Sequence, residues 1–256
     1  MEKWEAAARK FIEQCDFYDE IEAVFLTGSY VAGNADEYSD IDLYIVLNDN
    51  LTWRERGNKR IDGFLIEYFA NPVWQIKKYI DSSYNNVNIV EINMILNGIV
   101  IFDKNSAAES MRKHCLEKDI NNFPALHEFH IQTGLYGLWD EYDELTRAYN
   151  NKTADFAMQY FVLIKNTFAF YSKYIGSPVP NYHKLYKWLT SETYREGFKL
   201  PTYRDSAFLN LILNAFERAD MDAMFVQAGK VKDYVFDKLN GFDIDNYKLK
   251  GPCGNR

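Results

Sequence analysis

Several features that mark large classes of proteins are scarce or missing in this chain of 256 residues. Its three cysteines, Cys15, Cys115 and Cys253, are far apart and odd in number. They match neither a disulfide framework nor a Cys-x-x-Cys metal site. The N-terminus is a charged helix start and not the apolar segment of a signal peptide. No apolar run approaches the ~20 residues that a membrane span needs. We therefore expect a cytoplasmic protein with no membrane partner.

Basic residues are also fewer than acidic residues. There are 29 Lys and Arg residues against 37 Asp and Glu residues, which gives a formal net charge of −8. Nonspecific binding to nucleic acid needs a basic face for the phosphates, so this balance argues against a nucleic-acid partner. It suits a cationic small molecule or a metal-bound nucleotide. The hydrophobic fraction of 47% is that of a globular protein, and the length allows one large domain or two ordinary ones.

One stretch combines a glycine-serine turn with a pair of acidic residues. An apolar run ends at Gly28-Ser29, and Asp40 and Asp42 stand at the head of a second apolar run. Side chains two apart on a strand point to the same face, so the two carboxylates converge and form an oxygen-rich site for a hard divalent cation. Gly28 lets the backbone approach a ligand, and amides at a helix start bind phosphate. This arrangement predicts phosphoryl or nucleotidyl transfer.

A third acid, Glu67, lies in the middle of the apolar segment 61–70. An isolated buried carboxylate costs several kcal/mol or shifts its pKa, and a metal ion relieves that cost. The alternative is an edge strand on which Glu67 faces water. The acidic pair upstream favours Glu67 as the third carboxylate of a metal site.

Gly28-Ser29, ten intervening residues and Asp40-Ile41-Asp42 resemble the signature of the nucleotidyltransferase superfamily that includes DNA polymerase beta. Small members that modify aminoglycoside or lincosamide antibiotics are the most similar in size and layout. The resemblance covers about residues 20–70. It implies Mg²⁺-dependent transfer of a nucleoside monophosphate to a hydroxyl of a small molecule. The donor is ATP, which supplies AMP, or another NTP. A role in antibiotic resistance follows from the same resemblance. It also implies that Glu67 accepts the proton of the attacking hydroxyl in some members.

The order of the predicted elements indicates an α+β protein with two domains. We expect a nucleotidyltransferase-fold mixed sheet flanked by helices over residues 1–110, and an all-helical bundle that binds the acceptor over residues 111–256. Strands are expected at about 20–27, 40–47, 61–70 and 98–103. The polar and basic segment 52–60 is either a short helix or an exposed arm. A capping box at Ser106–Glu109 predicts a helix start.

An acidic stripe lies on the predicted helix 125–149. Asp140, Asp143 and Glu144 either form a solvated face, with an Asp143–Arg147 pair at i,i+4, or bind an amine-bearing acceptor. An acid of this stripe is also an alternative to Glu67 as the general base.

Two lysines in the helical half are candidates for binding the nucleotide phosphates. Residues 154–175 are apolar nearly all round, which predicts a central buried helix, and Lys165 is its only charge between Asp155 and Lys173. Lys165 either extends its head to the surface or points at the phosphates. Lys184 is the second candidate.

Other functions are compatible with parts of the pattern. One alternative is an antitoxin-type enzyme that adenylylates a partner protein, although the helical half predicted for this chain argues against the need for a helical partner. Another is a non-catalytic nucleotide-binding module, against which the complete set of acids argues. Polymerase activity is disfavoured by the net charge and the lack of a basic stripe interleaved with aromatics. The sequence leaves open the acceptor, the nucleotide preference and whether the protein is a monomer or a homodimer.

Overall fold

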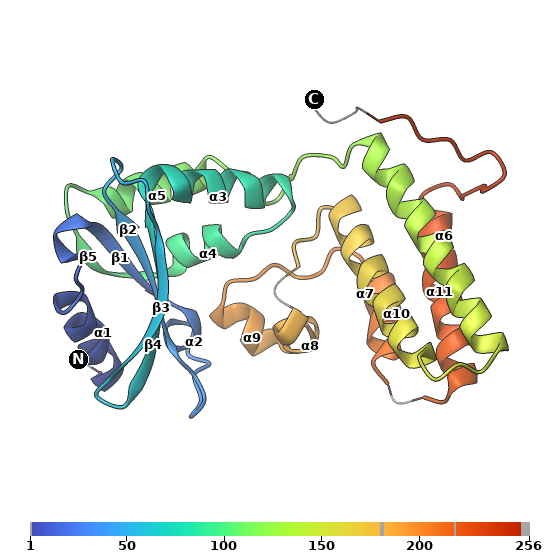
Figure 1. The fold of residues 1–256 in the computed structure, drawn as a ribbon, viewed down its shortest axis with the longest axis horizontal. Coiled ribbons are helices and arrows are strands. Elements are labelled where there is room, and N and C mark those ends of the chain that lie inside the picture. The colour runs from blue at the N-terminus through green and yellow to red at the C-terminus, as the bar shows by residue number, and fades with distance from the viewer. Residues whose placement is uncertain (1, 180–181, 218, 252–256) are drawn as a thin grey trace. The chain divides into compact units, whose positions relative to one another are not determined.

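The computed structural model describes residues 2–179, 182–217 and 219–251, so Cys253 lies outside the described residues. The chain folds into two compact units (Figure 1). The first consists of Met1–Phe123 and Pro180–Thr202, and the second of Pro124–Val179 and Tyr203–Arg256. We predicted two consecutive domains, 1–110 and 111–256. The observed division differs from that prediction, because residues 180–202 are grouped with the N-terminal sheet.

A mixed five-stranded sheet forms the centre of the first unit. Its order is β3 (Glu55–Ile61), β4 (Phe64–Pro72), β2 (Ile41–Leu47), β1 (Ile21–Thr27) and β5 (Ile99–Asp103). Strands β2 and β4 are parallel, and the other three neighbouring pairs are antiparallel. Strands β1 and β2 are apolar along most of their length because both of their faces are buried.

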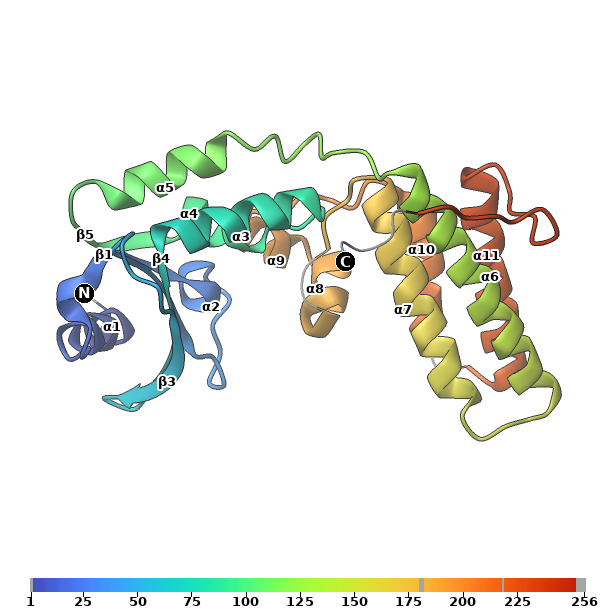
Figure 2. The same ribbon diagram turned by 45° about the horizontal axis from the view of Figure 1, so that its top comes forward.

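Helices cover both faces of this sheet (Figure 2). One face packs against α1 (Lys3–Glu13) in a core that contains Phe11, Ile12 and Leu43. The opposite face packs against α3 (Val73–Asn85), α4 (Val90–Asn97) and α5 (Ala107–Leu116). The sheet with its flanking helices, followed by a helical region, confirms the predicted α+β class.

The edge strand β3 occupies the segment for which we expected a short helix or an arm. It pairs with β4 through a two-residue turn at Asp62 and Gly63, whose φ angles of 49° and 90° suit a hairpin. Because β3 lies at the edge, its residues are mostly exposed, and it shows no apolar alternation. The polar composition of 52–60 therefore reflects the edge position rather than a helix.

The predicted capping box at the start of α5 is wrong in its hydrogen bonds. Ser106 has a left-handed backbone, with φ of 58°, and its side chain caps nothing. Instead, Oδ1 of Asp103 accepts a hydrogen bond of 3.1 Å from the amide of Ala108. A residue at the end of β5 thus caps the helix.

Residues 182–202 form η2 (Tyr182–Lys184), α8 (Leu185–Thr190) and α9 (Glu192–Gly197). The segment packs closely against the loop after α2 (Gly28–Val31), since a β-carbon on Gly197 would lie 2.4 Å from the carbonyl oxygen of Ala32. Leu200 packs against Val87 and Phe123. These contacts hold Lys184 within the first unit.

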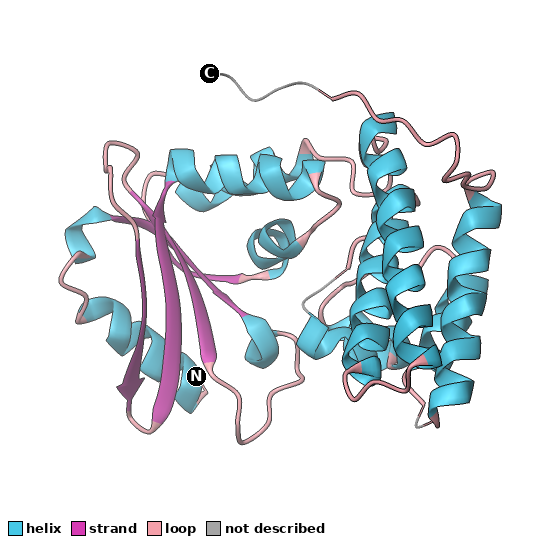
Figure 3. Cartoon of the chain, turned by 45° about the vertical axis from the view of Figure 1, so that its right-hand side comes forward, coloured by secondary structure: helices cyan, strands magenta, loops and turns pink. Residues whose placement is uncertain are grey.

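The second unit is helical, as predicted (Figure 3). It contains α6 (Glu128–Asn150), α7 (Phe156–Tyr174), α10 (Ser206–Ala215) and α11 (Met221–Lys238). Asp205 connects three of these helices: it caps α10 through the amide of Phe208 at 3.0 Å and accepts hydrogen bonds from the hydroxyls of Tyr171 and Tyr234 at 2.7 and 2.9 Å.

The prediction that residues 154–175 form a central buried helix is wrong in part. One face of α7 is buried, whereas Met158 and Phe161 are 65% and 51% exposed. Among the described residues, no helix is both long and apolar enough to cross a membrane.

Candidate active site

Asp40, Asp42 and Glu67 lie together at one end of the sheet. Each offers a carboxylate oxygen, and these three oxygens lie within 4.8 Å of one another. Asp42 on β2 stands directly opposite Glu67 on β4 in the parallel register, and Asp40 immediately precedes β2. Paired residues of neighbouring strands face the same side, which is why acids far apart in the sequence converge.

Burial and the neighbouring carboxylates change the chemistry of Asp42. Burial, reinforced by the negative charges of Asp40 and Glu67, raises the pKa of Asp42 to about 7, and the charge of Lys184 acts in the opposite direction. A divalent cation relieves repulsion between such carboxylates, and oxygen atoms are the ligands that Mg²⁺ and similar hard cations prefer. The donor set therefore fits such an ion.

Gly28 makes the close approach of the turn to Asp42 possible. Its φ is +75°, and a β-carbon on Gly28 would lie 1.9 Å from Oδ2 of Asp42. The short helix α2 follows, with the amide of Ala32 donating to the carbonyl of Gly28 at 3.1 Å. The Gly28-Ser29 turn therefore lies directly beside the acid cluster.

Arg56 is a residue of this site that the sequence analysis did not identify. Its Nη2 donates a hydrogen bond of 2.7 Å to Oε1 of Glu67, and its guanidinium lies 4.4 Å from the centre of the Phe69 ring. Asn58 stands opposite Glu67, so Arg56 is the diagonal cross-strand neighbour. The Asp62-Gly63 pair, a strong hairpin signal, indicates this pairing.

Lys184 lies in the same unit as the acid cluster. Besides acting on Asp42, its charge and that of Lys187 help to lower the pKa of Asp36, behind the larger effects of hydrogen bonds from the Tyr38 amide and the Ser39 hydroxyl. The loop before β2 thus faces positive charge from residues 184–187.

The remaining predicted site residues belong to the second unit. On α6, Asp143 and Glu144 both accept hydrogen bonds from Arg147, at 2.6 and 2.9 Å, and Asp140 is exposed. Lys165 is exposed on α7. The ion pairs with Arg147 agree with the solvated-face alternative, and the binding roles of these residues stay predictions.

One segment of the chain is similar to a known protein family. Residues 8–97 match the family described as "Nucleotidyltransferase domain". A solved structure of a nucleotidyltransferase-like protein from Exiguobacterium sibiricum 255-15 aligns with a TM-score of 0.47 and 12% sequence identity, over 92% of this chain and 79% of that chain. A search of the curated proteins finds no match. The family match includes Gly28, Ser29 and all three acids, so this segment is similar to nucleotidyltransferase domains at the residues that form the candidate site.

Proposed function

We propose that the protein is a Mg²⁺-dependent nucleotidyltransferase that moves a nucleoside monophosphate, AMP from ATP in the first instance, to a hydroxyl group of a small molecule. One observation carries this proposal: Asp40, Asp42 and Glu67 present oxygens within 4.8 Å of one another, beside a turn that only glycine can form at Gly28. Carboxylate clusters of this kind hold Mg²⁺ together with substrate phosphates.

Each residue has a role that follows from its place. Bound Mg²⁺ would supply electrostatic stabilisation to the attacking and leaving oxygens. The three acids would hold the ion through their carboxylate oxygens, and the backbone of Gly28-Ser29 would accommodate the triphosphate. Lys184, whose charge already acts on Asp42, offsets phosphate charge.

The transfer step needs a base for the acceptor hydroxyl. We assign this role to Glu67, because it lies in the acid cluster, whereas Asp143 and Glu144 belong to the second unit. The hydroxyl oxygen forms a bond to the α-phosphorus, the bond from that phosphorus to the bridging oxygen breaks, and pyrophosphate leaves. Glu67 takes the hydroxyl proton.

The acceptor is a small hydroxylated molecule. Aminoglycosides and lincosamides are the first compounds to try because of the resemblance noted above, and a cytoplasmic role in antibiotic resistance would follow from their modification. A partner protein as acceptor is the competing possibility.

The test is a direct search for the product. The full chain is incubated with Mg²⁺, each of the four NTPs and a panel of hydroxylated acceptors, and mass spectrometry detects the added nucleoside monophosphate. Asp42→Asn is expected to abolish the adduct and leave the fold intact. The matched control, Asp62→Asn, changes an exposed acid in the β3–β4 turn and should keep activity. Pyrophosphate release by Asp42→Asn at the unsubstituted rate refutes the assignment. ATP-dependent stabilisation without turnover on any acceptor supports a non-catalytic nucleotide-binding protein instead.

A further inference from the structure

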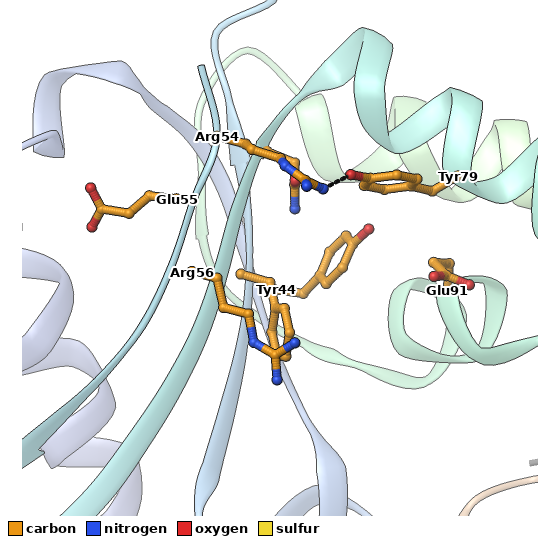
Figure 4. A pocket seen from close by; sticks show the side chains of 8 residues that line it. Tyr44, Arg54, Glu55, Arg56, Tyr79 and Glu91 are labelled. Atoms are coloured by element: carbon orange, nitrogen blue, oxygen red, sulfur yellow. Dashed lines mark hydrogen bonds between the residues drawn. The ribbon is translucent and has the colours of Figure 1, made fainter. Parts of the chain in front are cut away.

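A pocket of about 290 Å³ lies on the sheet face that carries the acid cluster (Figure 4). Tyr44 and Phe69, which line it, are partners in the β2–β4 register, two residues beyond the partners Asp42 and Glu67. Residues two apart on a strand share a face, so the pocket residues Tyr44 and Phe69 lie on the same face of the sheet as the acids. Such a volume lies at the small end of ligand pockets, which span roughly 300–1,000 Å³.

The hydroxyl of Tyr44 is the most informative group in this pocket. Tyr44 is only 4% exposed, and among the described residues its hydroxyl has no hydrogen-bond partner. Figure 4 shows the hydroxyl end of the ring directed toward the space between Tyr79 and Glu91. Buried hydroxyls are nearly always hydrogen-bonded, so a donor left without a partner here indicates a ligand that accepts from it.

Further donors surround this hydroxyl. Arg54 donates a hydrogen bond to the hydroxyl oxygen of Tyr79, which leaves the proton of Tyr79 available to a ligand. No carboxylate within the described residues forms an ion pair with Arg54. Arg56 also lines this pocket, and it donates a hydrogen bond to Glu67. A group that satisfies Arg54, Tyr44 and Tyr79 together must supply several acceptor oxygens.

One carboxylate faces this pocket and sets a second requirement. Glu91 on α4 accepts a hydrogen bond of 2.5 Å from Ser83 and lines the pocket. The carboxylate oxygens of Glu91 can accept a further hydrogen bond, for example from a hydroxyl group of a ligand. The other nearby acid, Glu55, accepts a hydrogen bond from Tyr68 at 2.6 Å, and Figure 4 shows its side chain directed away from the pocket.

We propose that this pocket binds the acceptor, and that the acceptor is a hydroxylated small molecule with an anionic oxygen group, either a carboxylate or a phosphate. The proposal rests on the proposed function, because Glu67 beside the pocket takes the proton of the acceptor hydroxyl. Arg54, Tyr44 and Tyr79 hold the anionic group, and Glu91 accepts from a hydroxyl. The donors Arg54, Tyr44 and Tyr79 thus suit an anion, in contrast to the cationic acceptor that the net charge of the chain suggests.

Four probes of hexose size separate the possibilities: glucose 6-phosphate, gluconate, glucose and glucosamine. Their binding to the full chain is measured by calorimetry without Mg²⁺ or NTP, so the result does not depend on transfer. At least one of the two anions is expected to bind about tenfold more tightly than glucose, because hydrogen bonds to charged groups are the stronger ones. The anion that binds more tightly shows whether the pocket prefers a phosphate or a carboxylate group. Glucosamine binding as tightly as the better anion, or neither anion binding, overturns the proposal.

A pair of tyrosine substitutions tests the site itself. Tyr44→Phe removes a hydroxyl without a partner, so the melting temperature should stay unchanged or rise, while the favoured anion binds about 3- to 10-fold more weakly. Tyr84→Phe, on α3, removes a hydroxyl that donates to the carbonyl of Asn122 at 3.0 Å. It should lower the melting temperature and leave anion binding unchanged. Unchanged anion binding in Tyr44→Phe overturns the proposal. Anion binding without nucleotide transfer to any acceptor refutes the proposed function alone.

Discussion

Gly28 and Asp42 lie so close together that a β-carbon on Gly28 would stand 1.9 Å from Oδ2 of Asp42. The turn and the acid cluster therefore form a single unit of structure. Gly28→Ala should displace the Asp42 carboxylate, lower the free energy of unfolding and abolish both Mg²⁺ binding and transfer. Calorimetry with Mg²⁺ and a pyrophosphate-release assay measure these effects.

Gly33→Ala is the matched control for that substitution. Gly33 also has a positive φ, of +68°, but a β-carbon there would meet nothing within 4 Å. Gly33→Ala should lower the free energy of unfolding by about 1 kcal/mol, because alanine is disfavoured in the left-handed backbone conformation. Mg²⁺ binding should be unchanged. Equal Mg²⁺ affinities in the two variants would contradict the role of the Gly28–Asp42 contact.

The raised pKa of Asp42 predicts how the stability of the metal-free protein depends on pH. Unfolded, this carboxyl titrates near 3.8, and folded, near about 7, so between these values the folded state binds more protons. The free energy of unfolding therefore falls as the pH rises through this window, by at most about 4 kcal/mol from this group. Urea unfolding at about pH 5 and about pH 8 measures the part of this change that lies above pH 5, at most about 3 kcal/mol. Asp42→Asn should lose most of it, and an equal slope in that variant would point to other groups.

Mg²⁺ should reverse this trend. Its carboxylate ligands must be deprotonated, so the ion competes with the proton on Asp42 and binds more tightly as the pH rises. The increase in melting temperature on adding Mg²⁺ should be larger at about pH 8 than at about pH 5. An equal increase at both pH values would show that Asp42 is not a ligand.

Arg56 should act as a positioning residue for Glu67. Arg56→Met removes the 2.7 Å hydrogen bond to Glu67, and we expect kcat to fall about tenfold with the KM for the nucleotide unchanged. Stability should change by less than about 1 kcal/mol, because the arginine is largely exposed. Arg60→Met, on the same exposed edge strand, is the control and should keep full activity. Loss of activity in both variants would indicate a general effect of charge.

Asp205 should be a main source of stability in the second unit. Although burial raises it, the pKa of Asp205 is held below its usual value by the amide of Phe208 and the hydroxyls of Tyr171 and Tyr234. Asp205→Ala removes a helix cap and both phenol contacts, which should cost about 2–4 kcal/mol in urea unfolding. Asp220→Ala removes only the cap of α11, at the amide of Ala223, and should cost about 1 kcal/mol. Equal losses would show that the phenol contacts contribute nothing.

The sequence was sufficient for the acid cluster because the relevant information is local. Asp40 and Asp42 have the two-residue spacing of one strand face, and Glu67 interrupts an apolar strand. The parallel register of β2 and β4 then brings them together. Short motifs on buried strands thus carry enough information to place side chains on a face.

Other parts of the site depend on contacts that local patterns do not encode. An edge strand has no need for apolar alternation, so β3 and its Arg56 were missed despite the Asp62-Gly63 turn. The position of Lys184 depends on the packing of residues 182–202 against a unit whose first part ends at Phe123, about sixty residues earlier in the sequence. No periodicity within residues 180–202 predicts that return.

The return of residues 180–202 to the first unit has a consequence for how the protein is made. The chain passes from one unit to the other after Phe123, after Val179 and again after Thr202. During synthesis, the sheet with its three acids leaves the ribosome well before the segment that carries Lys184. The positive charge of Lys184 acts on Asp42 only after that later segment has emerged. A nascent or truncated chain that ends at Phe123 therefore contains the three acids but lacks Lys184.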